Sequence, residues 1–278
     1  MKPILCIPSY CRPNGVAIER CKDLPLEKFI FIRKEQEELY SKWKNYYALV
    51  TQTTGTDIGK VRRNIMTWSS KHEYEWVFML DDDISKVEIL GKKPNGVITS
   101  QRIVDGIPGP RMEIGAFKEW FKQTAQNGLV LSSPNHRAFD RFHHGQLLVN
   151  KSACIQCVLV HVPTAMSVGN YKSLKDTGNE DYYMQYLFMR AGYKVGKIGT
   201  IEYDCPAVGS GEGGNNAGEY TNLTEKYNTY VNTFLSEVCS DPRLITTKIT
   251  KTGQKSIQFV WKNWNGYSIP MTLKGERT

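Results

Sequence analysis

The stretch from Trp76 to Ser85 constrains the fold more than any other part of the sequence. It runs from five consecutive apolar residues directly into three carboxylates, Asp81, Asp82 and Asp83. An apolar run of this length, with aromatic and branched side chains, is typical of a strand buried on both faces of a mostly parallel sheet. In such sheets helices cover both faces. The stretch therefore predicts an α/β fold with an acidic strand end at the edge of the sheet.

The three carboxylates also predict a metal site. Adjacent carboxylates at one strand end repel one another, and burying one of them without a partner is costly. A hard divalent cation such as Mg2+ or Mn2+ relieves this, because it binds oxygen ligands and keeps waters or phosphates in its shell. Side chains alternate along an extended segment, so we expect Asp81 and Asp83 to share a direction and Asp82 to oppose them. The alternative is a solvated acidic turn after an edge strand.

The bulk composition limits the class of protein. With 278 residues and 40% hydrophobic content, the chain is large enough for one α/β domain with a smaller appendage. Its seven cysteines have no framework-like spacing, which predicts reduced thiols and a cytoplasmic protein. We expect no membrane span and no signal peptide. The net charge of +8 favours a polyanionic partner such as nucleic acid.

The first half of the chain predicts an ordered series of strands and helices. Short apolar runs at 4–10, 29–32 and 47–50 indicate buried strands, and residues 33–40 have the charge pattern of a helix start. The third run leads into 55–68, a glycine-bearing loop that opens a helix. This order, ending at the acidic strand, is that of a nucleotide-binding α/β half.

Cations and polar residues gather where this half would meet a ligand. Lys60, Arg62 and Arg63 lie near a predicted helix start, where anions are favoured; the alternative is an exposed basic helix face. In an open α/β sheet the ligand crevice lies at the carboxyl ends of the strands. The segment from Pro8 to Arg12, which follows the first strand, is therefore also expected to face a ligand.

The second half of the chain continues the alternation with weaker signals. Residues 135–145 are polar, basic and aromatic, which predicts a mobile substrate loop. We divide the chain into a catalytic domain at 1–220 and a C-terminal extension at 221–278. The other expected elements are a helix at 112–121, strands at 129–132, 154–160 and 194–198, a helix from 221 to about 239, and a hairpin within 245–264.

Glu180 and Asp181 stand at the start of a strongly apolar predicted helix. A carboxylate is favoured in the first turn of a helix, so capping would explain one of them. Two adjacent carboxylates at the mouth of a buried helix suggest that one is a general base, and we assign this role to Asp181. Capping alone is the alternative.

The segment 207–220 is too rich in glycine for regular structure. It predicts either close backbone approach to a ligand or a lid that orders on binding. A flexible linker is the alternative, although linkers more often carry Ser and Pro than Glu, Asn and Tyr.

Three motifs, taken in order, resemble those of glycosyltransferases with the GT-A fold. They are Ile-Pro-Ser-Tyr-x-Arg-Pro at 7–13, Met-Leu-Asp-Asp-Asp at 79–83 and Asn-Glu-Asp at 179–181, and the resemblance covers about residues 1–220. The small size and the Gly-Gly-Asn loop are most similar to phage enzymes that glycosylate hydroxymethylated pyrimidines in DNA, the TET/JBP-associated glycosyltransferase group. This resemblance implies a GT-A-like domain, with a central mostly parallel sheet flanked by helices and a small C-terminal helix and hairpin extension.

The resemblance also implies a role for each matching residue. Asp81 and Asp83 would hold Mn2+ or Mg2+. Many GT-A enzymes supply a late His to the metal, but no His follows His161 here, so Glu212, Asn215 or a water would substitute. Asp181, with Glu180 beside it, would deprotonate the acceptor. The donor nucleotide would be bound by Pro8, Ser9, Tyr10, Arg12, Arg62, Arg63, Asn64, Asp82, Gly214 and Asn215.

Together these features predict a metal-dependent, inverting transfer of a sugar from a UDP-sugar to a hydroxymethylated pyrimidine in double-stranded phage DNA, in the host cytoplasm. One alternative is a polysaccharide or protein acceptor. A sugar nucleotidyltransferase is another, but that class usually opens with a glycine-rich phosphate loop where this chain has Pro8-Ser9-Tyr10. A DNA-binding module without activity would leave the triple Asp unexplained.

Overall fold

The structure is a computed structural model that describes most of the chain. It covers residues 3–52, 58–106, 112–138, 143–169, 180–206, 223–249, 253–271 and 273. The predicted glycine-rich segment, with Glu212, Gly214 and Asn215, lies outside the described residues. Part of the predicted substrate loop, 139–142, lies outside them as well.

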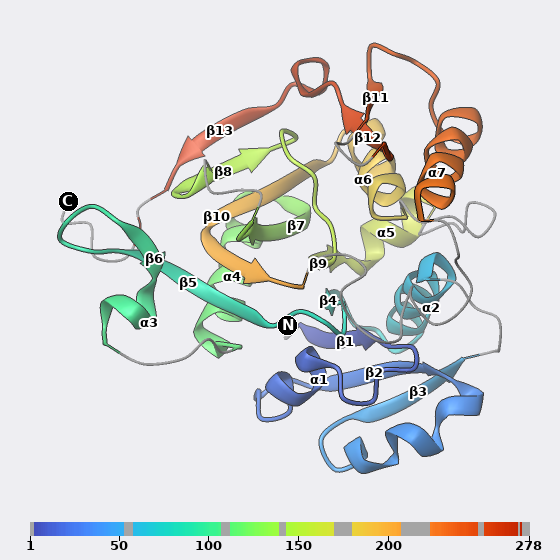
Figure 1. Cartoon of the computed structure of the whole chain (residues 1–278), viewed down its shortest axis with the longest axis vertical. Helices are drawn as coiled ribbons and strands as arrows, with labels where there is room; N and C mark the ends of the chain where they lie inside the picture. Colours follow the sequence, from blue (N-terminus) through green and yellow to red (C-terminus); the bar gives the residue numbers. More distant parts are fainter. Residues whose placement is uncertain are drawn as a thin grey trace.

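A mixed 11-stranded sheet forms the centre of the molecule (Figure 1). Its main path runs in the order β13-β8-β10-β7-β9-β4-β1-β2-β3, with β5 paired to β10 and β6 paired to β5. The strands are β1 (Ile4–Pro8), β2 (Lys28–Arg33), β3 (Ala48–Gln52), β4 (Trp76–Leu80), β5 (Lys86–Lys92), β6 (Ile98–Ser100), β7 (Leu129–His136), β8 (Gln146–Val149), β9 (Cys157–His161), β10 (Lys194–Asp204) and β13 (Tyr267–Pro270).

Most central strands of this sheet point the same way. Strands β4, β1, β2 and β3 are parallel neighbours. Strand β9 is antiparallel to both β4 and β7, and β10 is parallel to β7, so only β9 is reversed between β10 and β3. The predicted α/β class, with a mostly parallel central sheet, is confirmed. The carboxyl ends of β1, β4, β7 and β10 consequently meet at one edge of the sheet.

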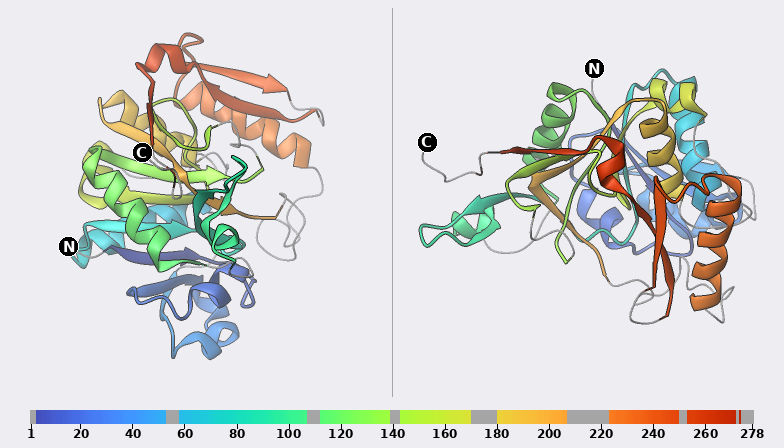
Figure 2. Two further views of the ribbon diagram at one scale, coloured as in Figure 1. Left: turned by 90° about the vertical axis from the view of Figure 1, so that its left-hand side faces the viewer. Right: turned by 90° about the horizontal axis from the view of Figure 1, so that it is seen from above.

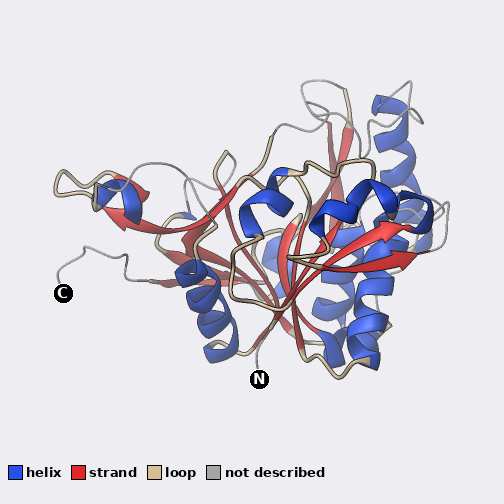
Figure 3. Cartoon of the chain, turned by 90° about the horizontal axis from the view of Figure 1, so that it is seen from below, coloured by secondary structure: helices blue, strands red, loops and turns tan. Residues whose placement is uncertain are grey.

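Helices cover both faces of the sheet, as seen in the right-hand view of Figure 2 and in Figure 3. Phe78 and Leu80 of β4 belong to a core with residues of α1 and α4, whereas Val77 and Met79 belong to a core with α2, α5, α6 and α7. The strand is therefore buried on both faces, as its apolar run predicts. The helices are α1 (Val16–Cys21), α2 (Ile58–Lys71), α3 (Gln101–Val104), α4 (Ile114–Gln126), α5 (Val162–Val168), α6 (Glu180–Arg190) and α7 (Leu223–Glu237).

The second half of the sheet departs from the predicted boundaries. β7 continues to His136, so Asn135 and His136 are buried strand residues and not part of a mobile loop. β10 is far longer than predicted, because its distal part pairs with both β5 and β7. Its register shifts around Gly199, where a Cβ would lie 2.2 Å from the His143 carbonyl oxygen. Pairing between distant strands thus overrides the local polarity of these segments.

Other boundaries differ by smaller amounts. β4 ends at Leu80 and the three Asp residues follow it in a turn. The strand expected from Cys154 begins at Cys157, and the helix expected after Arg33 is a pair of 3-10 segments, Lys34–Gln36 and Glu38–Trp43.

The C-terminal elements pack on the main body. The predicted helix and hairpin are present as α7 and as β11 (Ile245–Ile249) with β12 (Lys255–Phe259). Phe234, Phe259 and Trp264 join the core that contains α6, and β13 adds an edge strand to the main sheet through β8. A separate domain boundary near residue 220 stays a prediction. All seven cysteines are free, and no helix in the described ranges is long and apolar enough to cross a membrane.

Candidate active site

The acidic turn after β4 is bound to the loop after β1. Arg12 Nη1 lies 3.0 Å from Asp82 Oδ1 and 3.1 Å from Asp83 Oδ2. Ser9 Oγ donates to Asp82 Oδ2 at 2.6 Å and lies 2.7 Å from the Tyr40 hydroxyl. Burial raises the pKa of the Asp82 carboxyl, while Ser9 and Arg12 act in the opposite direction. The predicted ligand-facing loop and the acidic strand end thus form one charged cluster. The expectation that Asp82 points away from Asp83 is wrong, because these residues lie in a turn and both contact Arg12.

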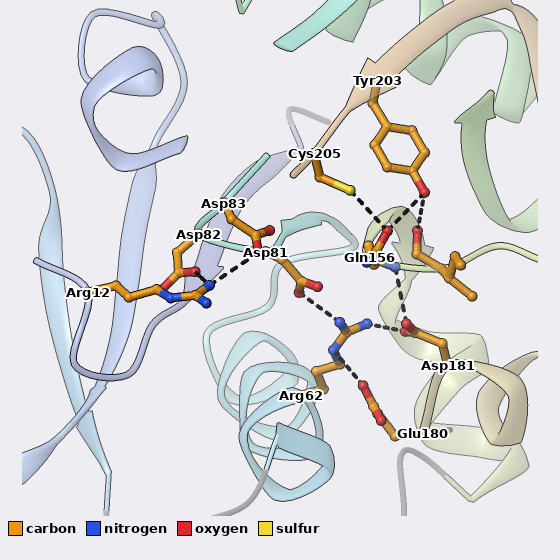
Figure 4. A network of polar contacts seen from close by, with 11 residues as sticks. Arg12, Arg62, Asp81, Asp82, Asp83, Gln156, Glu180, Asp181, Tyr203 and Cys205 are labelled. Atoms are coloured by element: carbon orange, nitrogen blue, oxygen red, sulfur yellow. Dashed lines mark hydrogen bonds and ion pairs between the residues drawn. The ribbon is translucent and has the colours of Figure 1, made fainter. Parts of the chain in front are cut away.

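A second arginine, Arg62 of α2, connects this turn with the start of α6 (Figure 4). Only 2% of its side chain is exposed. Nη2 donates to Asp81 Oδ1 at 2.7 Å, Nε lies 3.3 Å from Glu180 Oε1, and Nη1 donates to Asp181 Oδ1. The predicted metal ligand, the predicted base and its neighbour are therefore held by one guanidinium.

The electrostatics of this cluster are dominated by burial. Burial raises the pKa of the Asp81 carboxyl well above its usual range, and Arg62 opposes the shift. Burial also raises the pKa of the Asp181 carboxyl, against Arg62 and a backbone N–H from Gln156. A raised pKa makes a carboxylate a stronger proton acceptor, as a general base requires.

Gln156 is a residue of the site that the sequence analysis missed. Its backbone N–H donates to Asp181 Oδ2 at 3.1 Å, and its carbonyl accepts from the Asp81 N–H at 3.1 Å. Its side-chain oxygen accepts from the Tyr203 hydroxyl at 3.4 Å and from Cys205 Sγ at 3.5 Å. The only signal in the sequence is that Gln156 is the single polar residue in an otherwise apolar run from 154 to 160.

The other predicted nucleotide-binding residues are distributed around this centre. Pro8 ends β1 and is buried. The Arg33 guanidinium lies 3.7 Å from the centre of the Tyr10 ring. Asn64 and Arg63 are exposed on α2, and Asn64 Nδ2 donates to Gln52 Oε1 at 2.8 Å. The roles of these residues in binding a nucleotide stay predictions.

The donor set at the acidic turn fits a hard divalent cation. Side chains of Asp81 and Asp83 are 25% and 34% exposed, while that of Asp82 is 7% exposed. Two carboxylates suit Mg2+ or Mn2+ when phosphate oxygens and waters complete the shell. Within the described residues no group of three His, Cys, Asp or Glu could hold a metal alone. Nearby, burial raises the pKa of the Cys205 thiol to about 12, so it stays a neutral group.

Comparison with known proteins gives similarity at the level of structure only. No protein-family model matches the sequence, and no curated protein matches it. Residues 1–349 of Staphylococcus aureus TarS have 11% identity and a TM-score of 0.48, over 87% of this chain and 74% of that one. GalNAc-T7 with UDP, GalNAc and Mn2+ has 9% identity and a TM-score of 0.46, over 74% of this chain and 44% of that one. CMP:2-keto-3-deoxy-manno-octonic acid synthetase with CTP has 9% identity and a TM-score of 0.45, over 74% of this chain and 91% of that one. Likeness at this level assigns no activity to the chain.

Replacing Arg62 by Met tests whether its charge holds the site together. Met keeps much of the apolar stem but leaves buried carboxylates without their cation, which typically destabilises a protein by roughly 3–5 kcal/mol. The pKa values of Asp81 and Asp181 are already raised, so the carboxylates freed of Arg62 take up protons as the pH falls. The loss in unfolding free energy, measured in urea, should therefore be smaller near about pH 5 than near about pH 8.

The neighbouring variant Arg63→Met is the matched control, since Arg63 is exposed on the same helix. It should change the unfolding free energy by no more than about 0.5 kcal/mol. Equal losses in the two variants, or a loss at Arg62 that does not change with pH, would contradict the assignment.

Proposed function

We propose that this chain is a GT-A-type glycosyltransferase. It transfers a sugar from a UDP-sugar to the hydroxyl of a hydroxymethylated pyrimidine in double-stranded DNA. The observation that carries the proposal is the Arg62 bridge, which holds Asp81 from the acidic turn and Asp181 from the start of α6 in one site. A metal-diphosphate group and a proton acceptor in one crevice are the parts that sugar transfer needs.

The donor side of the proposal uses the residues around the acidic turn. Asp81 and Asp83 would hold Mn2+ or Mg2+, which when bound supplies positive charge against the leaving diphosphate. Arg12 fixes the turn through Asp82 and Asp83, and so orients the carboxylates before a donor binds. The nucleotide would be bound further by Pro8, Ser9, Tyr10, Arg62, Arg63, Asn64, Gly214 and Asn215, with Glu212 as a candidate third metal ligand.

The acceptor side of the proposal rests on Asp181. An oxygen of its carboxylate takes the proton of the acceptor hydroxyl as that hydroxyl attacks the anomeric carbon. The bond from this carbon to the diphosphate oxygen breaks, and UDP leaves with the electron pair. Attack opposite the leaving group inverts the anomeric configuration. Burial supports the role, because it raises the pKa of Asp181 towards the working range of a base.

The choice of DNA as acceptor is supported by charge. The chain carries 36 Lys and Arg against 28 Asp and Glu. This excess of positive charge favours binding of a polyanion such as DNA. A nucleotide-sugar alone would account only for a local basic cluster.

Asp83→Asn tests the metal-binding turn. The amide removes one of two carboxylate charges, so the gain in UDP affinity that Mn2+ gives should fall at least roughly tenfold. Isothermal titration of UDP with and without Mn2+ measures this. The control is Asp23→Asn, an exposed carboxylate in the turn after α1. An unchanged Mn2+-dependent gain in the Asp83 variant would exclude this residue as a ligand.

Asp181→Asn tests the base. The amide keeps the shape of the side chain but cannot take a proton, so kcat should fall roughly 10²–10⁴-fold while UDP affinity is kept. Glu180→Gln is the matched comparison, because Glu180 is the adjacent carboxylate and contacts the same guanidinium. A larger loss of kcat in the Glu180 variant would indicate that Glu180, and not Asp181, is the base.

The function itself is tested by mass spectrometry of digested nucleosides. DNA with hydroxymethylcytosine or hydroxymethyluracil is incubated with the protein, Mn2+ and a panel of UDP-sugars, with unmodified DNA as control. We expect a pentose or hexose mass gain on the hydroxymethylated DNA alone. Hydrolysis of one UDP-sugar without any mass gain on DNA would support the assignment as a glycosyltransferase but indicate a polysaccharide or protein acceptor. If neither a mass gain on DNA nor hydrolysis of a UDP-sugar is seen with any donor, the proposal is overturned.

A further inference from the structure

Gln156 lies between the two acidic groups to which the proposed transfer assigns chemistry. We propose that Gln156 is a positioning residue. Its backbone fixes the Asp181 carboxylate relative to the acidic turn, and its side chain fixes that backbone to the end of β10. This inference rests on the proposed function and adds a residue that none of the motifs in the sequence contains.

The backbone of Gln156 makes one hydrogen bond to each side of the site. Its N–H donates to Asp181 Oδ2 and its carbonyl accepts from the Asp81 N–H, both at 3.1 Å. Arg62 donates to the other Asp181 oxygen, Oδ1. The Asp181 carboxylate is therefore held through both oxygens, which restricts its rotation and determines which lone pairs face an acceptor.

The conformation of Gln156 makes this double contact possible. Its φ of 61° lies in the left-handed region, which non-glycine residues seldom adopt. Such residues persist where surrounding contacts hold them, and they cluster at functional sites. In this chain the residue immediately precedes β9, so the turn joins a core strand directly to the catalytic carboxylates.

The side chain of Gln156 supplies those surrounding contacts. Tyr203, a fully buried residue of β10, directs its hydroxyl to the Gln156 side-chain oxygen at 3.4 Å and to the Ile155 carbonyl at 3.3 Å. Cys205 Sγ lies 3.5 Å from the same side-chain oxygen. Figure 4 shows Tyr203 and Cys205 on one side of Gln156 and Asp181 on the other. The end of β10 thus anchors the turn that orients Asp181.

Three substitutions distinguish the role of the Gln156 backbone conformation from that of its side chain. Gly and Asn both accept a positive φ, so Gln156→Gly and Gln156→Asn should keep the backbone donor in place. Val is β-branched and strongly disfavours that region, so Gln156→Val should displace it. We expect kcat to fall roughly 10²-fold in the Val variant, the effect of a misplacement of about 1 Å, with KM for the UDP-sugar nearly unchanged. The Gly and Asn variants keep the backbone donor but remove or shorten the side-chain anchor, so we expect their kcat to fall by only roughly tenfold.

The control is Glu73→Val. Glu73 also has a positive φ, of 60°, but lies exposed after α2 and outside the site. This variant should lose stability in the same way without a loss of kcat. Thermal unfolding establishes which variants are folded. If Gln156→Val does not fold, Tyr203→Phe, which removes one anchoring hydroxyl, takes its place and should lower kcat by roughly tenfold.

The outcomes separate this inference from the proposed function. A folded Val variant with the kcat of the wild type would overturn the role of Gln156. The proposed function would still stand in that case, because the wild-type chain transfers the sugar. Losses in the Gly and Asn variants as large as in the Val variant would likewise overturn it. A wild-type chain that neither transfers nor hydrolyses any UDP-sugar would overturn both.

Discussion

One buried positive charge, the guanidinium of Arg62, is the interaction on which the site depends. Carboxylates from the turn after β4 and from the first turn of α6 meet around it, with Asp181 separated from Arg62 by 119 residues in the chain. Carboxylates brought so close together away from water would repel one another and take up protons. The cation makes it possible for the two acidic segments to meet at one place while α2 packs against the core.

A second arginine performs the same task on the other side of the acidic turn. Arg12 binds Asp82 and Asp83, so each carboxylate of the triple Asp has an arginine partner. The turn is therefore held from β1 on one side and from α2 on the other. A divalent cation that binds Asp81 and Asp83 would share these carboxylates with the two arginines, so metal binding and the ion pairs are linked.

The arrangement combines a stable scaffold with a strained centre. The strands that lead into the site are apolar and buried on both faces, whereas the site itself contains buried carboxylates with raised pKa values and a glutamine with a positive φ. Such features lower stability and are typical of positions kept for chemistry. The carboxyl ends of β1, β4, β7 and β10 provide the edge at which these features are assembled.

Local patterns in the sequence determined the α/β class, the buried strand that precedes the triple Asp, and the helix that begins at Glu180 and Asp181. These follow from the period of apolar residues and from charges at the ends of elements, which are short-range properties. The basic helix α2 was also readable, because its signal lies within a few consecutive residues. The glycine-bearing loop expected before it, at 55–57, lies outside the described residues.

Only the tertiary structure decided the partners of Arg62, the role of Gln156 and the length of β10. From the sequence Arg62 is one of three cations near the start of a helix, and nothing local distinguishes it from Arg63. Its surroundings depend on Glu180 and Asp181 at the start of α6, which contact its guanidinium. β10 extends because β5 and β7 pair with it. These contacts join residues far apart in the chain, and no local period or charge pattern specifies them.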